Sequence, residues 1–323
     1  MLRLAILCIA TVLVFASVPT VAADCPPLPP PYMGPIFDAN VQSWNPDLDH
    51  VLDALQDAGV KRIALFANSR KGEASPTAQA VAALAQAQPD TIVLGAPKIG
   101  FITGGDLPRD YIAETVTGVR AGTYKFVGEI LYTHGDKPDQ AKPTRTGEVY
   151  VDPAGAGTKT LLAQLAGSNV PLLTHFEAWA WERDRANIDK LYSSWPQQRF
   201  VLPSLAYGSP AIADALLSAH PNLWATISRL VDGRYEFVDP AKMAKLGPSM
   251  FDACGTLLPA WQAVLIKHSD RLMYGSDFYT TNGRSWYGYE EPIRKYREIA
   301  GQLPPDVAEH ISWDNAAALY GVR

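Results

Sequence analysis

The stretch Leu272-Met273-Tyr274-Gly275-Ser276-Asp277 lies near the C-terminal end of the 323-residue chain. It predicts a short buried strand, 272–276, that runs through a glycine and is followed directly by an aspartate. In a barrel of alternating strands and helices, carboxylates at the C-terminal ends of the strands face a shared pocket. Asp277 is therefore the first candidate for chemistry, although an aspartate in this position also commonly accepts hydrogen bonds from the amides of a turn.

Seven further apolar runs precede this stretch and alternate with helical patterns. Strands that alternate with helices imply a parallel sheet, and eight such units favour an α/β fold of the closed (β/α)8 type, a TIM barrel. An open doubly wound sheet is the alternative, but it usually has a glycine-rich turn after its first strand, and residues 38–43 contain no glycine. The predicted strands are 35–42, 62–68, 91–97, 125–132, 171–176, 199–205, 223–230 and 272–276, and the predicted helices are 48–58, 77–88, 109–120, 158–167, 183–195, 211–219, 260–268, 292–300 and 313–320.

The first 23 residues have the layout of a secretory signal peptide. Arg3 supplies a positive start, residues 4–14 are almost wholly apolar, and Val21-Ala22-Ala23 offers the small residues that a signal peptidase requires. The apolar run is shorter than the ~20 residues of a membrane span. We therefore expect cleavage after Ala23, a secreted or periplasmic protein, and no stable membrane insertion. A proline-rich arm, 24–34, then leads into a single barrel domain, 35–323, which ends in a C-terminal helical extension.

Three cysteines are present, and Cys8 leaves with the predicted signal peptide. The mature chain keeps Cys25 and Cys254. An even pair in an oxidising compartment is compatible with one disulfide that ties the new N-terminus to the segment before the last strand. Two separate buried thiols are the alternative, because pairing cannot be read from spacing.

The composition, 47% hydrophobic and 19% charged residues, is that of an ordinary globular protein. The net charge of −5 and the absence of a long basic run argue against a nucleic-acid-binding surface. We therefore expect a small-molecule substrate as the partner, and a homo-oligomer is compatible with the sequence.

Polar side chains stand at the C-terminal ends of most of the predicted strands. A single such residue is more often satisfied by a neighbouring loop than used in chemistry, but several at one end of a barrel indicate a site. From strand one to strand eight these residues are Asp38, Asn40 and Gln42, then Glu129, His175 and Glu177, Ser204 and Tyr207, Ser228 and Arg229, and Asp277.

Five stretches together resemble the landmarks of the amidohydrolase-related family, which comprises TIM-barrel metal-dependent hydrolases with decarboxylase and lactonase branches. The resemblance runs from about residue 35 to the end and is strongest in the eighth strand and the closing helix. Neither of these is a catalytic motif by itself, so the resemblance implies the fold before it implies an activity. The stretches are 36–42 (IFDANVQ), 172–175 (LLTH), 200–205 (FVLPSL), 270–277 (DRLMYGSD) and 313–321 (WDNAAALYG).

The chain departs from this family at the metal ligands. Family members carry His-x-His on strand one, where this chain has Asn40-Val41-Gln42, and they often carry a histidine on strand six, where Ser204 stands. His175 and Asp277 match the family's strand-five histidine and strand-eight aspartate. Amide oxygens are poor partners for Zn²⁺. The cofactor prediction is therefore no metal or one divalent ion, for which Glu129, His175 and Asp277 supply three ligands.

Three functions remain open. In the first, the chain is an exported hydrolase of a small, anionic ester, lactone or amide, with no metal or one weakly held ion. Asp277 is then the general base that activates water, His175 polarises the carbonyl or shuttles a proton, and Arg229 clamps the anionic group. In the second, the barrel has lost catalysis and only binds a ligand. In the third, Glu129, His175 and Asp277 hold one Zn²⁺ or Mn²⁺ for hydrolysis or decarboxylation.

The presence of both His175 and Asp277 favours the first of these functions. Long loops usually have a function, and the segment 231–259 is predicted to cover the pocket. His134 opens the loop after strand four, with Asp136 nearby; membership of the site is one interpretation, and a solvated loop histidine is the one we favour. Besides Arg229, the substrate contacts predicted from the strand ends are Asn40, Gln42, Ser204, Tyr207 and Trp179.

Overall fold

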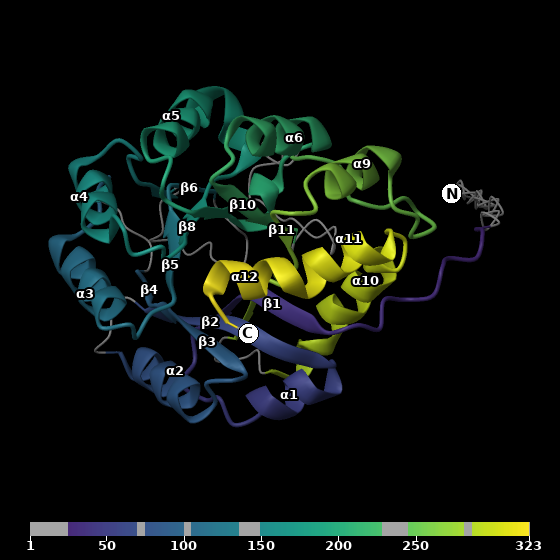
Figure 1. The fold of residues 1–323 in the computed structure, drawn as a ribbon, viewed down its shortest axis with the longest axis horizontal. Coiled ribbons are helices and arrows are strands. Elements are labelled where there is room, and N and C mark those ends of the chain that lie inside the picture. Colours follow the sequence, from purple (N-terminus) through teal and green to yellow (C-terminus); the bar gives the residue numbers. More distant parts are fainter. Residues whose placement is uncertain are drawn as a thin grey trace, which may run out of the picture.

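Parallel strands surrounded by helices form an α/β barrel in the computed structural model, which describes residues 25–69, 75–99, 105–135, 149–227, 245–280 and 286–322 (Figure 1). The predicted (β/α)8 barrel is thereby confirmed. The predicted signal peptide and Arg229 lie outside the described residues. In chain order, the barrel strands are β1 (Ile36–Ser43), β2 (Val60–Ser69), β3 (Ile92–Ala96), β5 (Phe126–Leu131), β8 (Leu172–His175), β9 (Phe200–Leu202), β10 (Leu223–Thr226), and β11 (Leu272–Met273) with β12 (Phe278–Thr280).

Helices cover the outside of the barrel (Figure 1). Two of them begin at a serine, Ser75 or Ser209, whose hydroxyl accepts a hydrogen bond from the backbone N–H three residues later and so caps the helix. No helix in the described part of the chain combines the length and apolarity that a membrane crossing requires. The surrounding helices are α1 (Val51–Asp57), α2 (Pro76–Ala87), α3 (Arg109–Arg120), α4 (Ala156–Leu165), α5 (Trp181–Ser194), α6 (Pro210–Ala219), α9 (Pro259–Lys267) and α10 (Glu290–Ala300), followed by α11 (Pro305–Glu309), a π-helical turn (His310–Asp314) and α12 (Asn315–Tyr320).

The eighth strand closes the barrel in two pieces. β11 pairs with β10, and β12 pairs with β1, both in parallel. Between the two pieces, the Tyr274 carbonyl accepts a hydrogen bond from Ala39 N, and Asp277 N donates one to the Asn40 carbonyl, each at 2.9 Å. These two bonds continue the pairing of strand eight with strand one across the break.

The break itself differs from the continuous strand predicted over 272–276. Gly275 lies so close to the neighbouring strand that a Cβ at this position would approach the Thr226 side chain to 2.9 Å. Asp277 then has a φ of 50°, which lies in the left-handed region that L-residues rarely enter. The chain therefore bends at the end of strand eight, and the bend sets the direction in which Asp277 leaves the barrel.

The sixth strand is also shorter than the predicted 199–205. β9 ends before Pro203, which has no N–H for the sheet, and residues 204–207 all have φ between 47° and 59°. A left-handed backbone costs roughly 1–2 kcal/mol per residue, so this turn requires support from its surroundings. Ser204 N donates to Thr226 Oγ1 at 3.0 Å, and Gly247 N donates to the Tyr207 carbonyl at 2.9 Å.

The interior of the barrel is apolar and closed at its N-terminal end by α12. The ring of Tyr320 lies 5.7 Å from that of Phe37 and 5.1 Å from that of Phe126, which both stand at the beginnings of strands. Its hydroxyl donates to the Ala39 carbonyl at 2.9 Å. In Figure 1, α12 lies across this end of the barrel. Polar chemistry is thereby left to the opposite, C-terminal end.

The N-terminal arm runs along α10 and is tied down twice. Arg297 donates to the carbonyls of Tyr32 and Gly34. Cys25 and Cys254 form a disulfide, so the first of the two cysteine alternatives is correct. The bridge closes a loop that contains the first seven barrel strands, because the two residues are 229 positions apart in the sequence.

Replacing both Cys25 and Cys254 by serine should lower the free energy of unfolding by about 2–4 kcal/mol, because the open chain gains entropy in the unfolded state. Denaturant unfolding of the oxidised wild type and of the variant measures the difference. The reduced wild type is the matched control and should unfold with the variant. Equal stabilities of oxidised and reduced wild type would contradict the prediction.

Candidate functional site

Four buried ionisable side chains form a continuous chain across the C-terminal ends of strands three to five. Lys98, in the short β4 (Lys98–Ile99) that follows β3, forms an ion pair with Glu129 of β5. The other carboxylate oxygen of Glu129 lies 2.6 Å from Nδ1 of His175, the last residue of β8. Nε2 of His175 lies 3.1 Å from Oε1 of Glu177. Positive and negative groups thus alternate along the chain.

The charge states of Glu129 and His175 are determined by the ionisable side chains next to them. Burial opposes the ionisation of Glu129, but the positive charges of Lys98 and His175 outweigh it and hold the pKa of Glu129 well below its usual value. Burial likewise favours a neutral imidazole at His175, but Glu129 and then Glu177 outweigh it and raise the pKa of His175. The imidazolium, with one carboxylate on each ring nitrogen, is therefore the favoured form in this hydrogen-bonded arrangement.

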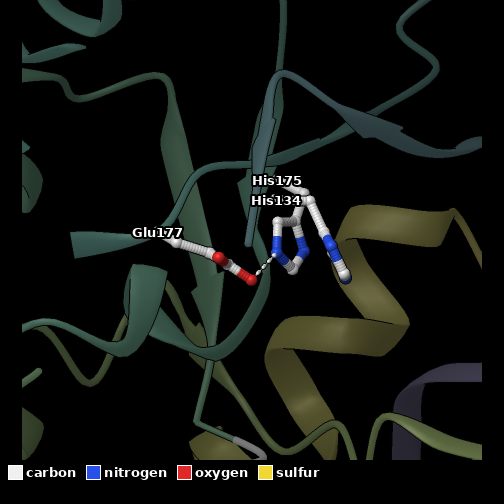
Figure 2. A group of neighbouring side chains, drawn as sticks. All are labelled: His134, His175 and Glu177. Carbon is white, nitrogen blue, oxygen red and sulfur yellow. Dashed lines mark hydrogen bonds and ion pairs between the residues drawn. The ribbon is translucent and has the colours of Figure 1, made fainter. Parts of the chain in front are cut away.

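His134 is part of the same site, and the expectation of a solvated loop histidine is wrong. It lies in β6 (Thr133–His134), which pairs antiparallel with β7 (Val149–Tyr150). This hairpin turns the His134 side chain inward, where it is 6% exposed and its ring centroid lies 5.3 Å from that of His175. Figure 2 shows the two imidazoles beside the carboxylate of Glu177.

Two hydrogen bonds to Oε2 fix the orientation of the Glu177 carboxylate. Trp179 Nε1 and Gly135 N both donate to Oε2 of Glu177 at 2.6 Å. Because these donors take one oxygen, the other is aimed at His175. Trp179 was predicted to contact substrate directly, and the structure shows that its indole N–H is used to orient a carboxylate.

The aspartate at the end of strand eight lies in a second network. Oδ1 of Asp277 accepts a hydrogen bond of 2.7 Å from the side-chain amide of Gln42 in β1. The amide oxygen of Gln42 accepts in turn from Asn68 of β2 at 3.2 Å. An ionised carboxylate only accepts hydrogen bonds, so the NH₂ group of Gln42 faces Asp277. The amide thereby fixes the orientation of the carboxylate.

Asn40 has a buried side-chain amide with no hydrogen-bond partner on either its oxygen or its nitrogen. It lies in the C-terminal half of β1, next to a shift in strand register between Asp38 and Val41. A buried amide without partners costs about 1–3 kcal/mol. A polar ligand at this end of the barrel would remove that cost, which makes Asn40 a candidate for ligand binding.

Two other predicted contacts, Ser204 and Tyr207, lie in the left-handed turn after strand six. Tyr207, at the end of the left-handed turn, presents its ring to His175 in a T-shaped arrangement at 5.8 Å between centroids. Tyr207 also forms an apolar cluster with Trp179 and Ala180, and Leu246, in the described part of the predicted cover, packs against this cluster. Ser204 is fully buried, and its backbone N–H is taken by Thr226.

The structure thus brings together some of the predicted site residues and separates others. Glu129 and His175 are in direct contact, whereas Asp277 contacts Gln42. Among the described residues, the group of three whose ligand atoms all lie within 4.8 Å of one another is His134, His175 and Glu177. The predicted metal set, in which Asp277 takes the third position, is not gathered in this way.

Two members of these networks were missed by sequence reasoning. Lys98 directly follows the predicted third strand, so its position alone was a usable signal, but a lysine there is most often solvated. Asn68 ends the predicted second strand in the same way. Both can be recognised when the residues at the ends of neighbouring strands are considered together, because these ends lie side by side in a barrel.

Asp38 holds strand one against strand eight and takes no part in the two networks. Its Oδ1 accepts from Ser276 N at 2.7 Å and its Oδ2 from the Tyr289 hydroxyl at 2.8 Å. Burial raises the pKa of Asp38 from 3.8 to about 6, and these hydrogen bonds offset burial only in part. Its ionisation therefore costs stability.

The comparisons with known proteins agree with this architecture. The sequence profile of the family described as amidohydrolase matches residues 78–322. An uncharacterised TIM-barrel protein from Bordetella bronchiseptica is similar in structure, with a TM-score of 0.58 and 14% identity over 89% of this chain and 100% of that one. A 2,6-dihydroxybenzoate decarboxylase in complex with 2,6-dihydroxybenzoate is similar in structure, with a TM-score of 0.54 and 11% identity over 90% of this chain and 99% of that one.

A zinc-bound amidohydrolase from Burkholderia multivorans gives a TM-score of 0.55 and 14% identity over 90% of this chain and 100% of that one. At these identities the likeness establishes the fold. No curated protein matches the chain.

Replacing Lys98 by methionine should destabilise the protein by about 3–5 kcal/mol, because Glu129 loses one of its two buried positive partners. Denaturant unfolding measures the loss. The double variant Lys98→Met, Glu129→Gln removes the charge on both sides and should recover part of it. Glu129→Gln is also measured by itself. If it lowers the free energy of unfolding by the same amount in the wild type and in Lys98→Met, the two residues are not coupled.

The pH dependence of stability should contain a contribution from Asp38. A carboxyl whose pKa is raised by folding stabilises the folded state below its unfolded pKa and loses that contribution as the pH rises through the folded pKa. Between about pH 4.5 and 8, the wild type should therefore lose about 2 kcal/mol relative to Asp38→Asn. Asp57→Asn, on an exposed face of α1, is the control. Parallel stability profiles of wild type and Asp38→Asn would contradict the assignment.

Proposed function

The chain belongs to the amidohydrolase family, and we propose that it hydrolyses a small ester, lactone or amide at the C-terminal end of its barrel. Asp277 is the general base that activates the attacking water, and the amide of Gln42 positions its carboxylate. His175, held between Glu129 and Glu177, is the acid on the opposite wall. Asn40 donates to the carbonyl oxygen of the substrate.

The hydrogen bond of 2.7 Å from Gln42 to Asp277 is the observation that carries this proposal. A general base must be held within reach of the proton it removes, and a fixed carboxylate meets that condition. The bond is itself supported from Asn68, so strands one, two and eight together hold the base in place. A site that only binds a ligand does not require a carboxylate whose orientation is fixed by Gln42 and, through Gln42, by Asn68.

A metal ion in the position implied by the family resemblance does not fit these residues. Gln42 turns its NH₂ group toward Asp277 while its oxygen accepts from Asn68, so the side of the amide that faces strand eight carries donors and no ligand atom. Asn40, the other replacement, brings only a neutral amide. We therefore base the reaction on Asp277 and on the protein's own hydrogen-bond donors.

The anionic character predicted for the substrate depends on Arg229. The described side chains of the two networks do not carry an excess of positive charge, because Lys98 and a protonated His175 pair with Glu129 and Glu177, and Asp277 adds a third carboxylate. Arg229 follows strand seven and lies outside the described residues. We propose it as the cation that would select an anionic substrate.

Export remains part of the proposal. The signal-like N-terminus supports it, and so does the disulfide between Cys25 and Cys254, because such bridges persist mainly in oxidising compartments.

Asp277→Asn should lower kcat/KM by about 10²–10⁴, because an amide cannot take a proton from water. Purified protein is assayed against a panel of small lactones, esters and amides, each in a neutral and an anionic form. Asp270→Asn is the matched control, since Asp270 is exposed and precedes strand eight at the other end of the barrel. Unchanged turnover in Asp277→Asn would overturn the role of the base.

Arg229→Gln should raise KM for the anionic members of the same panel and leave the neutral members unchanged. An equal effect on both forms would contradict the assignment of Arg229 to an anionic group. Binding of panel members without turnover by the wild type would favour a ligand-binding protein over a hydrolase.

A further inference from the structure

We infer that His134, His175 and Glu177 form a binding site for one divalent transition-metal ion, with Zn²⁺ as the preferred ion. This site lies on the strand-four and strand-five side of the barrel, away from Asn40 and Gln42. The inference concerns ion binding; it shares His175 with the proposed function, but Asp277, the proposed base, is not a ligand.

The ligand atoms are close to the spacing that an ion requires. Ligands of tetrahedral zinc at about 2.0–2.1 Å from the metal lie roughly 3.3 Å from one another. His175 Nε2 and Glu177 Oε1 are already 3.1 Å apart. All three ligand atoms lie within 4.8 Å of one another, so a shift on the order of 1 Å in the His134 ring completes the set. Figure 2 shows the Glu177 carboxylate directed at the neighbouring imidazole, with the second imidazole beside that ring.

Two of the three ligands already have the outer partners that metal ligands usually have. A metal-binding histidine generally donates its second ring N–H to a carboxylate, and His175 Nδ1 lies 2.6 Å from Glu129 Oε1. Glu129 is in turn held by Lys98. The second oxygen of Glu177 accepts from Trp179 Nε1 and Gly135 N. His175 and Glu177 are therefore oriented through atoms other than the two that would bind the ion.

The chemistry of the ligand set selects the kind of ion. Two imidazoles and one carboxylate suit Zn²⁺, whereas Ca²⁺ and Mg²⁺ prefer oxygen ligands alone. Three protein ligands leave one position open for water or another molecule. With neutral imidazoles the three residues carry one negative charge, and the nearby Lys98 and Glu129 cancel each other, so a divalent cation is attracted. All three ligands are buried, with exposures of 6%, 4% and 2% for His134, His175 and Glu177.

The hydrogen bond between His175 and Glu177 and the bonds to an ion use the same two atoms. The metal-bound and metal-free forms are therefore alternative states of one site. In the metal-free form the proton on Nε2 takes the place that the ion would occupy.

The test is metal binding to the untagged, full-length protein after dialysis against a chelator. Calorimetric titration with Zn²⁺ should give one ion per chain, and Co²⁺ should give the visible absorption of a four-coordinate site. His134→Gln and Glu177→Gln should each weaken Zn²⁺ binding at least 100-fold. His310→Gln is the matched control, because His310 is an exposed histidine on the surface, and it should bind like the wild type.

Asp277→Asn should also bind Zn²⁺ like the wild type, even if it has lost hydrolysis, so failure of the proposed function and failure of this inference are distinguishable. A rise in melting temperature on adding Zn²⁺, present in the wild type and absent in folded His134→Gln, checks the site without relying on affinity alone. No binding by the wild type, or binding that His134→Gln and Glu177→Gln leave unchanged, would overturn the inference.

Discussion

The pairing of strand one with the interrupted eighth strand is the constraint on which the site depends. Two backbone hydrogen bonds, from Ala39 to Tyr274 and from Asp277 to Asn40, close the barrel where the strand ladder is broken. Asp38 adds a buried carboxylate that accepts from Ser276 N. Because Asp277 donates its own N–H to strand one, its backbone is held in a left-handed conformation. The same contact places its side chain against the amide of the strand-one glutamine.

The site is built from two networks with different electrostatics. On the side of strands one, two and eight, a carboxylate is oriented by neutral amides, whose dipoles fix its direction without neutralising its charge. On the side of strands three to five, charges of opposite sign alternate in a buried chain. A buried charge is tolerated only when it is paired, and the alternation provides each member with a partner. His175 has a carboxylate at both ring nitrogens, and it is the residue that the charged chain shares with the proposed metal site.

Backbone strain is concentrated at the same end of the barrel. Residues 204–207 and Asp277 are in the left-handed region, and strained conformations persist only where the surroundings determine them strongly. In the turn after strand six, the support comes from Thr226 and from Gly247, whose close approach to Gly208 leaves no room for a side chain. The result is that Tyr207 lies against His175. The strained turn thus holds the Tyr207 ring beside His175.

The sequence by itself determined the barrel, since the order of apolar runs and helices is a one-dimensional pattern that survives small errors in element boundaries. It also placed Glu129, His175 and Asp277 at strand ends, because a strand end is a local property. It did not determine which strand ends face each other. Lys98 and His134 reach Glu129 and His175 only through the curvature of the sheet and a hairpin closed by Val149. The separation of Asp277 from the charged chain, and its pairing with Gln42, were decided by the tertiary structure, because distances across a barrel depend on its closure and not on the spacing of residues along the chain.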